Sequence, residues 1–147
     1  MLYEEAQSVE QELNMENLQK QSEALNWYEK ATINGHRDAQ LKMGIKFWKA
    51  QGVIQDNIKA IKWLTSAAEK DSAEAAYQLA QIYKTLEGQN SLVLKYLEQA
   101  ANLHHGHAAY KISRYYAKEM PGNPWYNYYL KIAAEQGHPK ALKYVNL

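Results

Sequence analysis

The sequence predicts an all-α protein in which antiparallel helix pairs stack into a solenoid. One pattern of residues recurs four times along the 147-residue chain, and its apolar positions follow the period of an α-helix. No stretch shows the sustained alternation of a β-strand. A helix pair of this length cannot bury its apolar face alone, so neighbouring pairs have to pack on one another.

The repeat is visible when four segments are aligned without a gap: residues 26–44, 62–80, 95–113 and 128–146. Their starts are 36, 33 and 33 residues apart. Four columns of the alignment keep their chemistry. In order, they hold an aromatic residue, an alanine, a residue at the helix junction and a large apolar residue: Trp27, Trp63, Tyr96 and Tyr129; Ala31, Ala67, Ala100 and Ala133; Gly35, Asp71, His104 and Gly137; Met43, Leu79, Ile112 and Val145. Agreement over so many columns indicates a true repeat.

Helical spacing of apolar residues places the individual helices. The first is expected over residues 2–14, as the start of an atypical and more polar pair, because its apolar residues are spaced i, i+3, i+7: Ala6, Val9 and Leu13. Over residues 58–69 one stripe holds Ile58, Ile61 and Leu64 or Ala68, with Trp63 and Ala67 beside it. The following helix presents Ala75, Leu79, Ile82 and Tyr83 on one face. A last helix without a partner is expected from His138 to Leu147, which gives nine helices.

Polar residues mark the helix starts. Asp71 is expected to cap the helix after it, with Glu74 as the reciprocal acceptor of a capping box. Asn123 before Pro124 is a second start signal, because proline at the first helical position loses no hydrogen bond. The same role is expected of Asp56 or Asn57 and of Asn90 or Ser91, and breaks between units are expected at Gly52, Gly88 and Gly122.

Small residues recur where two helices of a pair should cross. The alanine column falls in the middle of one helix, and Gly44, Ala80 and Ser113 are small at the matching point of its partner. Small side chains let the two backbones approach, while the neighbouring Trp or Tyr fills the wider space. We expect bulk in these columns to overpack the core, at a cost of about 1–3 kcal/mol each.

The run W-x-x-x-A-A-x-x-G-x-x-x-A-x-x-x-L-G resembles the Sel1-like repeat, a relative of the tetratricopeptide repeat. The segment Ala50 to Asp71, AQGVIQDNIKAIKWLTSAAEKD, is most similar, since the family favours G-V, then D, then K-A in this arrangement. The resemblance runs from about Ser22 to the C-terminus. The third and fourth units depart from it through a shortened G-V loop, His104 in place of glycine, and Val93 and Tyr126 in place of the alanine found at Ala60.

The resemblance implies a right-handed α-α superhelix (solenoid) of about four antiparallel helix pairs plus a C-terminal capping helix. We expect one domain over residues 1–147, with residues 1–21 as an atypical N-terminal cap and repeats at about 22–56, 57–90, 91–123 and 124–147.

Composition removes several function classes. Seventeen Lys+Arg against sixteen Asp+Glu leave no basic surplus for nucleic acid, and no cysteine is present for a disulfide framework or a cysteine nucleophile. No apolar window is long enough to span a membrane. The acidic start is unlike a signal peptide, so a cytoplasmic location is expected, or a periplasmic one if a signal peptide was removed.

The family resemblance implies a non-catalytic module that binds another protein in a concave groove, without a cofactor. Some small bacterial members look like immunity proteins that neutralise a toxin effector, and this is our most concrete expectation. The alternative is a general adaptor or regulatory scaffold of a signalling or envelope pathway. A hydrolase or β-lactam-binding role is more distant, because the branch linked to β-lactams carries disulfides and this chain has neither cysteine nor a nucleophile elbow.

If the pairs stack as in related repeats, the first helix of each pair lines the groove. The residues expected to contact the partner are apolar, then mixed, then basic and aromatic along the chain: Asp38, Leu41, Ile45 and Trp48; Glu74, Tyr77, Gln81 and Lys84; His107, Tyr110, Arg114 and Lys118. A partner with an apolar anchor and an acidic end would fit them. The alternative is that Leu41, Ile45 and Trp48 pack on the first pair and that the charges form a solvated face.

Two other clusters have simpler explanations. His104, His105 and His107 invite a metal site, but no carboxylate or further histidine stands at helical spacing to complete one, and a role at the helix junction is favoured. Trp125 and Tyr128 lie on another side of their helix from the core residue Tyr129, and could face solvent or a partner.

Overall fold

The described part of the chain is entirely helical. The computed structural model describes residues 2–11 and 18–144, in which helices and their connections occur without a strand. The helices are α1 (Leu2–Gln11), α2 (Leu18–Ile33), α3 (Arg37–Lys49), α4 (Asn57–Glu69), α5 (Ala73–Thr85), α6 (Asn90–Asn102), α7 (Gly106–Glu119), α8 (Trp125–Glu135) and α9 (Pro139–Leu142). The all-α prediction is confirmed, while Leu13 and Val145, which carry part of the predicted pattern, lie outside the described residues.

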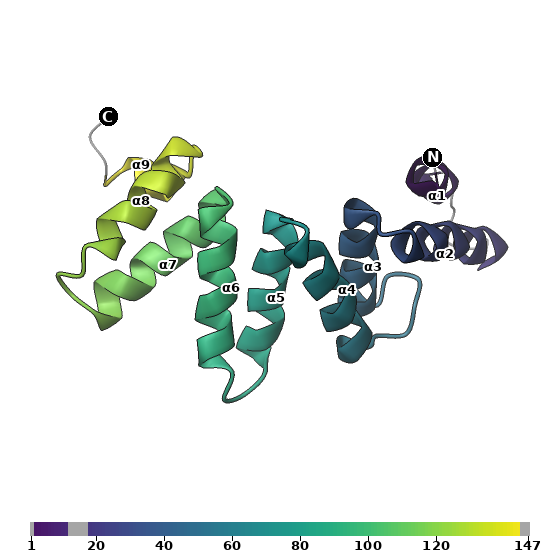
Figure 1. The fold of residues 1–147 in the computed structure, drawn as a ribbon, viewed down its shortest axis with the longest axis horizontal. Coiled ribbons are helices and arrows are strands. Elements are labelled where there is room, and N and C mark those ends of the chain that lie inside the picture. The colour runs from purple at the N-terminus through teal and green to yellow at the C-terminus, as the bar shows by residue number, and fades with distance from the viewer. Residues whose placement is uncertain (1, 12–17, 145–147) are drawn as a thin grey trace. The chain divides into compact units, whose positions relative to one another are not determined.

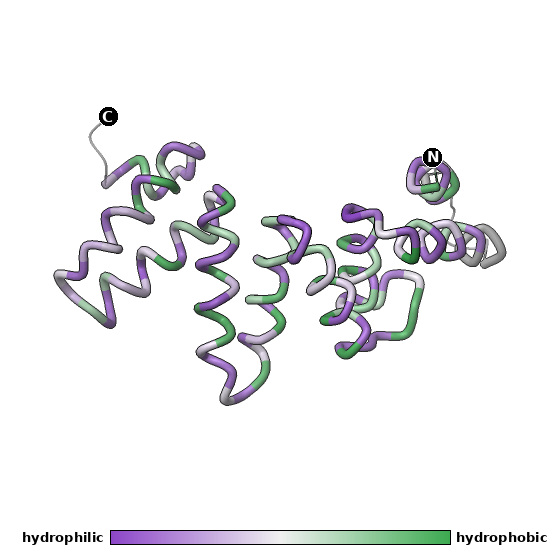
Figure 2. Tube along the Cα trace, viewed as in Figure 1, coloured by the Kyte–Doolittle hydropathy of each residue, from purple (hydrophilic) through white to green (hydrophobic). Residues whose placement is uncertain are grey.

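The chain divides into two compact units, Met1–Lys70 and Asp71–Leu147. In the first, α1 to α4 pack each on the next, and in the second, α5 to α9 do the same (Figure 1). Hydrophobic and hydrophilic stretches alternate along the helices (Figure 2). Accordingly, none of the described helices has both the length and the apolar character needed to cross a membrane. The prediction of a single domain with repeat starts near residues 22, 57, 91 and 124 stays a prediction.

The predicted small columns lie at the helix crossings. Ala67, Ala100 and Ala133 are fully buried. A Cβ atom on Gly44 would lie 2.5 Å from Cγ of Leu64 and 3.2 Å from its backbone nitrogen, so α3 and α4 touch almost backbone to backbone. Ser113 is also fully buried, and its hydroxyl donates to the Tyr110 carbonyl at 2.7 Å, which satisfies its polar group.

Stacked tyrosines fill the wider space beside the crossings in the second unit. The rings of Tyr83 and Tyr96 are parallel to within 4° at 5.7 Å, and those of Tyr116 and Tyr129 to within 2° at 6.1 Å. The Tyr116 hydroxyl also donates to Glu98 at 2.9 Å, and burial together with this carboxylate raises the pKa of Tyr116 to about 12. The two stacks join α5 to α6 and α7 to α8, and the hydrogen bond joins α6 to α7.

The first unit is held by a charged cluster over an apolar core of Ala6, Tyr28 and Met43. Glu10 accepts hydrogen bonds from Lys46 at 2.8 Å and from the Tyr28 hydroxyl at 2.7 Å. Burial alone would raise the pKa of the Glu10 carboxyl, but these two donors outweigh it and the pKa is lowered. One carboxylate from α1 therefore joins α2 and α3.

The junction column shares one backbone conformation. Gly35, Asp71, His104 and Gly137 have φ of 82°, 64°, 64° and 79°, in the left-handed region. The prediction that Asp71 caps α5 is wrong, because in this conformation it ends the turn before α5, and Ser72 accepts from the Ala75 N–H at 3.2 Å instead.

Other helix starts were predicted with mixed success. Asp56 caps α4 by accepting from the Lys59 N–H at 3.1 Å, as expected. The prediction of Asn123 as the cap of α8 is wrong by one residue, because Pro124 is the capping residue and the helix begins at Trp125, although the Asn123 side chain accepts from the Trp125 N–H at 2.9 Å. Neither Asn90 nor Ser91 caps α6, whose start has no side-chain cap. Ile58, which the sequence places on the same stripe as Leu64, is 83% exposed. Six residues turn a helix by about 240°, so Ile58 and the buried Leu64 point in different directions.

Substituting Gly44→Ala should destabilise the protein by about 1–3 kcal/mol, whereas the same change in an unhindered helix stabilises by about 0.5–1 kcal/mol. The reversal of sign comes from the contact with Leu64. Urea unfolding followed by circular dichroism measures it, and the penalty should shrink in a Leu64→Ala background, where the obstructing atoms are gone. A more stable Gly44→Ala protein would contradict the close crossing.

Candidate functional site

The predicted partner-binding residues fall in both units. Asp38, Leu41, Ile45 and Trp48 lie on α3 in the first unit, and the other eight lie on α5 and α7 in the second. In the first unit, Asp38 is exposed beside Arg37, and the three apolar side chains are half-buried. They lie on a different side of α3 from Met43 and Phe47, which face the core between α2 and α4.

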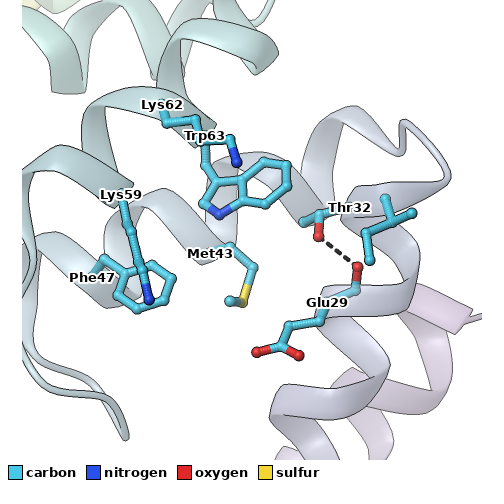
Figure 3. Close-up of a pocket in the computed structure, with 8 residues that line it drawn as sticks. Glu29, Thr32, Met43, Phe47, Lys59, Lys62 and Trp63 are labelled. Atoms are coloured by element: carbon cyan, nitrogen blue, oxygen red, sulfur yellow. Dashed lines mark hydrogen bonds between the residues drawn. The ribbon is translucent and has the colours of Figure 1, made fainter.

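Sequence reasoning missed a pocket of about 220 Å³ on the core side of α3. Phe47 and Trp63 occupy the columns filled by stacked tyrosines in the second unit, but here they stand apart over Met43 (Figure 3). Lys59 lies over the Phe47 ring at 5.3 Å and Lys62 over the Trp63 ring at 4.9 Å. The pocket is lined by Glu29, Thr32, Ile33, Met43, Phe47, Lys59, Lys62 and Trp63.

In the second unit, two predicted tyrosines each stack on a histidine of the next repeat. Tyr77 lies on His105 with ring centroids 4.6 Å apart and planes inclined by 16°. Tyr110 lies on His138 at 4.3 Å and 8°. Neither stack was expected from the sequence, which predicts for His105 only a role at the helix junction. The signal that could have revealed the stacks is that both pairs are separated by 28 positions in the sequence.

His105 performs three tasks at the start of α7. Its Nδ1 accepts from the Ala108 N–H at 3.1 Å, which leaves the ring proton of the neutral form on Nε2. Nε2 then pairs with Glu74 at 2.8 Å. Helix cap, hydrogen-bond donor and stacking platform are combined in one side chain, which ties α5 to α7 along this face.

His107 and His138 form a pair of imidazoles. Nδ1 of His107 lies 3.1 Å from Nε2 of His138, and a hydrogen bond at this distance needs one ring to donate and the other to accept. Burial lowers the pKa of His107, helped by Lys111, and burial together with Lys140 lowers the pKa of His138. Both effects favour the neutral pair.

Arg114 is surrounded by aromatic rings. Its guanidinium carbon lies 5.6 Å from the Tyr110 ring, 5.2 Å from Tyr126 and 4.7 Å from Tyr144. Its buried Nε and Nη2 have no hydrogen-bond partner among the described residues. The rings fix the cation by cation–π attraction without supplying an acceptor.

The remaining predicted residues of this unit are cationic or polar. Gln81 and Lys84 on α5 line a pocket together with residues of α6 and α7, and Lys118 is exposed near the end of α7. His104 occupies the left-handed junction. Within residues 2–11 and 18–144, no group of three or more His, Cys, Asp or Glu side chains is placed to hold a metal ion.

Comparison with known proteins identifies the repeat. Five segments match the family model described as Sel1 repeat: residues 18–36, 37–72, 73–90, 94–105 and 127–138. No curated protein matches the sequence.

Solved structures share the architecture. A Sel1 repeat protein from Oxalobacter formigenes is 27% identical, with a TM-score of 0.71 over 82% of this chain and 95% of that one. The protective antigen c5321 of uropathogenic Escherichia coli, which displays the SLR fold, is 18% identical, with a TM-score of 0.77 over 95% of this chain and 31% of that one. The immunity protein Pa5087 from Pseudomonas aeruginosa, 18% identical over 95% of this chain and 66% of its own, reaches a TM-score of 0.44, too low to indicate a shared fold.

The histidine pair predicts a pH-dependent stability. The folded pKa values of His107 and His138 lie below the ordinary 6.5, so the unfolded chain binds protons more readily, and stability falls as pH drops from about 7.5 to 5.5. Urea unfolding across this range should show the loss, and His107→Gln with His138→Gln should reduce it. His104→Asn, which keeps a side chain tolerated at positive φ, is the matched control and should retain it. Equal pH slopes in all three proteins would exclude the pair as the cause.

Proposed function

Because the chain belongs to the Sel1 repeat family, we propose that it binds one cognate protein and catalyses no reaction. Sel1 repeats are generally protein-interaction modules. The proposed contact surface is the face of the second unit that carries Tyr77, Tyr110 and Arg114, which we call the tyrosine face.

The ring-held guanidinium of Arg114 is the observation that carries this proposal. Arginine and tyrosine are the residue types that dominate binding energy in protein interfaces. Here Arg114 lies against Tyr110, and Tyr110 is stacked on His138, so little side-chain freedom remains to be lost on binding. A partner would meet a surface that is already ordered.

The most concrete form of the proposal is an immunity protein that neutralises a toxin effector. Binding through the tyrosine face would cover the toxin's active site or block its substrate. The alternative is an adaptor that holds several clients of a signalling or envelope pathway. The two differ in the number of partners and in whether the partner is harmful by itself.

Affinity capture from the native organism, with mass spectrometry, tests the surface. The wild-type chain should retain one protein, and the combined variant Tyr77→Ala, Tyr110→Ala and Arg114→Ala should lose it. A matched control removes two other aromatic residues, Trp125 and Tyr128, which are 49% and 47% exposed on α8. Circular dichroism checks that each protein remains helical. Capture that survives the threefold variant but is lost with Trp125→Ala and Tyr128→Ala would move the interface to α8.

Growth measurements separate the two roles. An immunity protein should have a captured partner that arrests growth when produced alone, and co-production of the wild-type chain should restore growth while the threefold variant does not. Several captured partners without toxicity would favour the adaptor.

A further inference from the structure

We propose that the pocket between α5, α6 and α7 receives an apolar side chain from an acidic segment of the partner protein. This inference rests on the proposed function, since it specifies the chemistry of the partner at the same face. The pocket lies wholly within the second unit, has a volume of about 350 Å³, and is lined by Ala80, Gln81, Lys84, Asn90, Val93, Leu97 and Lys111.

The floor of the pocket is apolar. Ala80 and Leu97 are only 2% and 8% exposed, and Val93 is half-buried beside them. Val93 stands where the second unit of the repeat has Ala60, and Ala80 belongs to the small column. An aliphatic or aromatic side chain placed on this floor would remove apolar surface from water, which is favourable.

The rim of the pocket is cationic. Lys84 reaches it from α5 and Lys111 from α7. Lys111 is held in place, because its ammonium group lies 5.0 Å from the centroid of the Tyr77 ring. Further along α7, Arg114 and Lys118 follow Lys111 at i+3 and i+7, so they share its face of the helix.

No carboxylate is among the described residues that line the pocket. Glu74 is already paired with His105 at 2.8 Å and accepts from Gln78 at 2.8 Å. The chain as a whole has a net charge of only +1, so the row of Lys84, Lys111, Arg114 and Lys118 is a local concentration of positive charge. Complementary charge in the partner means Asp or Glu beside the apolar anchor.

A polypeptide satisfies this arrangement better than a small molecule. The cations extend beyond the pocket along α7, so one carboxylate at the rim would leave Arg114 and Lys118 unused. A peptide with several acidic residues after its anchor can meet the rim and the row together.

A displayed library of random peptides, selected on the immobilised full chain, tests the proposal. Enriched peptides should combine an apolar residue with neighbouring Asp or Glu. Their affinity should fall about fivefold to tenfold with each of Lys84→Glu and Lys111→Glu, and the loss should be greater at low salt. Lys131→Glu, at an exposed position on α8, is the matched control and should leave affinity unchanged.

Three results would overturn the inference: absence of enrichment, enriched peptides without acidic residues, or binding that ignores both charge reversals. Dodecanoate provides a further arm, since saturable binding of this small carboxylate with the same lysine dependence, without peptide enrichment, would assign the pocket to a small amphiphile. If instead the captured protein depends on Tyr110 and Arg114 but tolerates Lys84→Glu and Lys111→Glu, the proposed function stands and only the pocket assignment fails.

Discussion

The close approach of helices at small residues is the constraint on which the rest of each unit depends. At Gly44 the space for even a single methyl group is taken by Leu64, and the buried Ala80 and Ser113 hold the equivalent place along the chain. Backbones this near leave gaps to either side of the crossing. Large rings fill them, either as stacked tyrosines in the second unit or as Phe47 and Trp63 in the first.

Both units join successive helix pairs through a histidine at a helix start that stacks on a tyrosine two helices earlier. In the first unit His36 stacks on Tyr3 with ring centroids 4.7 Å apart, and in the second unit two such stacks follow one another, Tyr77 on His105 and Tyr110 on His138. The first unit adds a carboxylate from α1, which accepts hydrogen bonds from a lysine and a tyrosine of two neighbouring helices. The two successive stacks are why the second unit offers an ordered row of aromatic rings along one face.

Much of the helical framework could be predicted from sequence, because it depends on periodicity. The columns of Ala67 and Leu79 predict which helix faces are buried, and both residues are buried in the structure. Details set by a single backbone angle were harder. Asp71 is a residue type that often caps helices, but its backbone is left-handed and Ser72 is the capping residue. The position of the cap is therefore one residue later than predicted.

The residues of the candidate site could be predicted from the sequence better than the contacts between them. Tyr77, Tyr110 and Arg114 follow from counting along helices. Their partners, His105, His138 and Tyr144, belong to other helices or to the end of the chain, and only three-dimensional packing brings them together. Neither the hypothesis of a metal site nor the predicted role at the helix junction includes the stacking of the histidine rings.

The tyrosine–histidine stack also indicates how a repeat array of this kind is extended. In the second unit each link joins a tyrosine to a histidine 28 positions later, and successive links are 33 positions apart, at Tyr77 and Tyr110. Duplication of a 33-codon stretch of the gene would therefore carry its own link with it, and the row of stacked rings offered to a partner would lengthen by one.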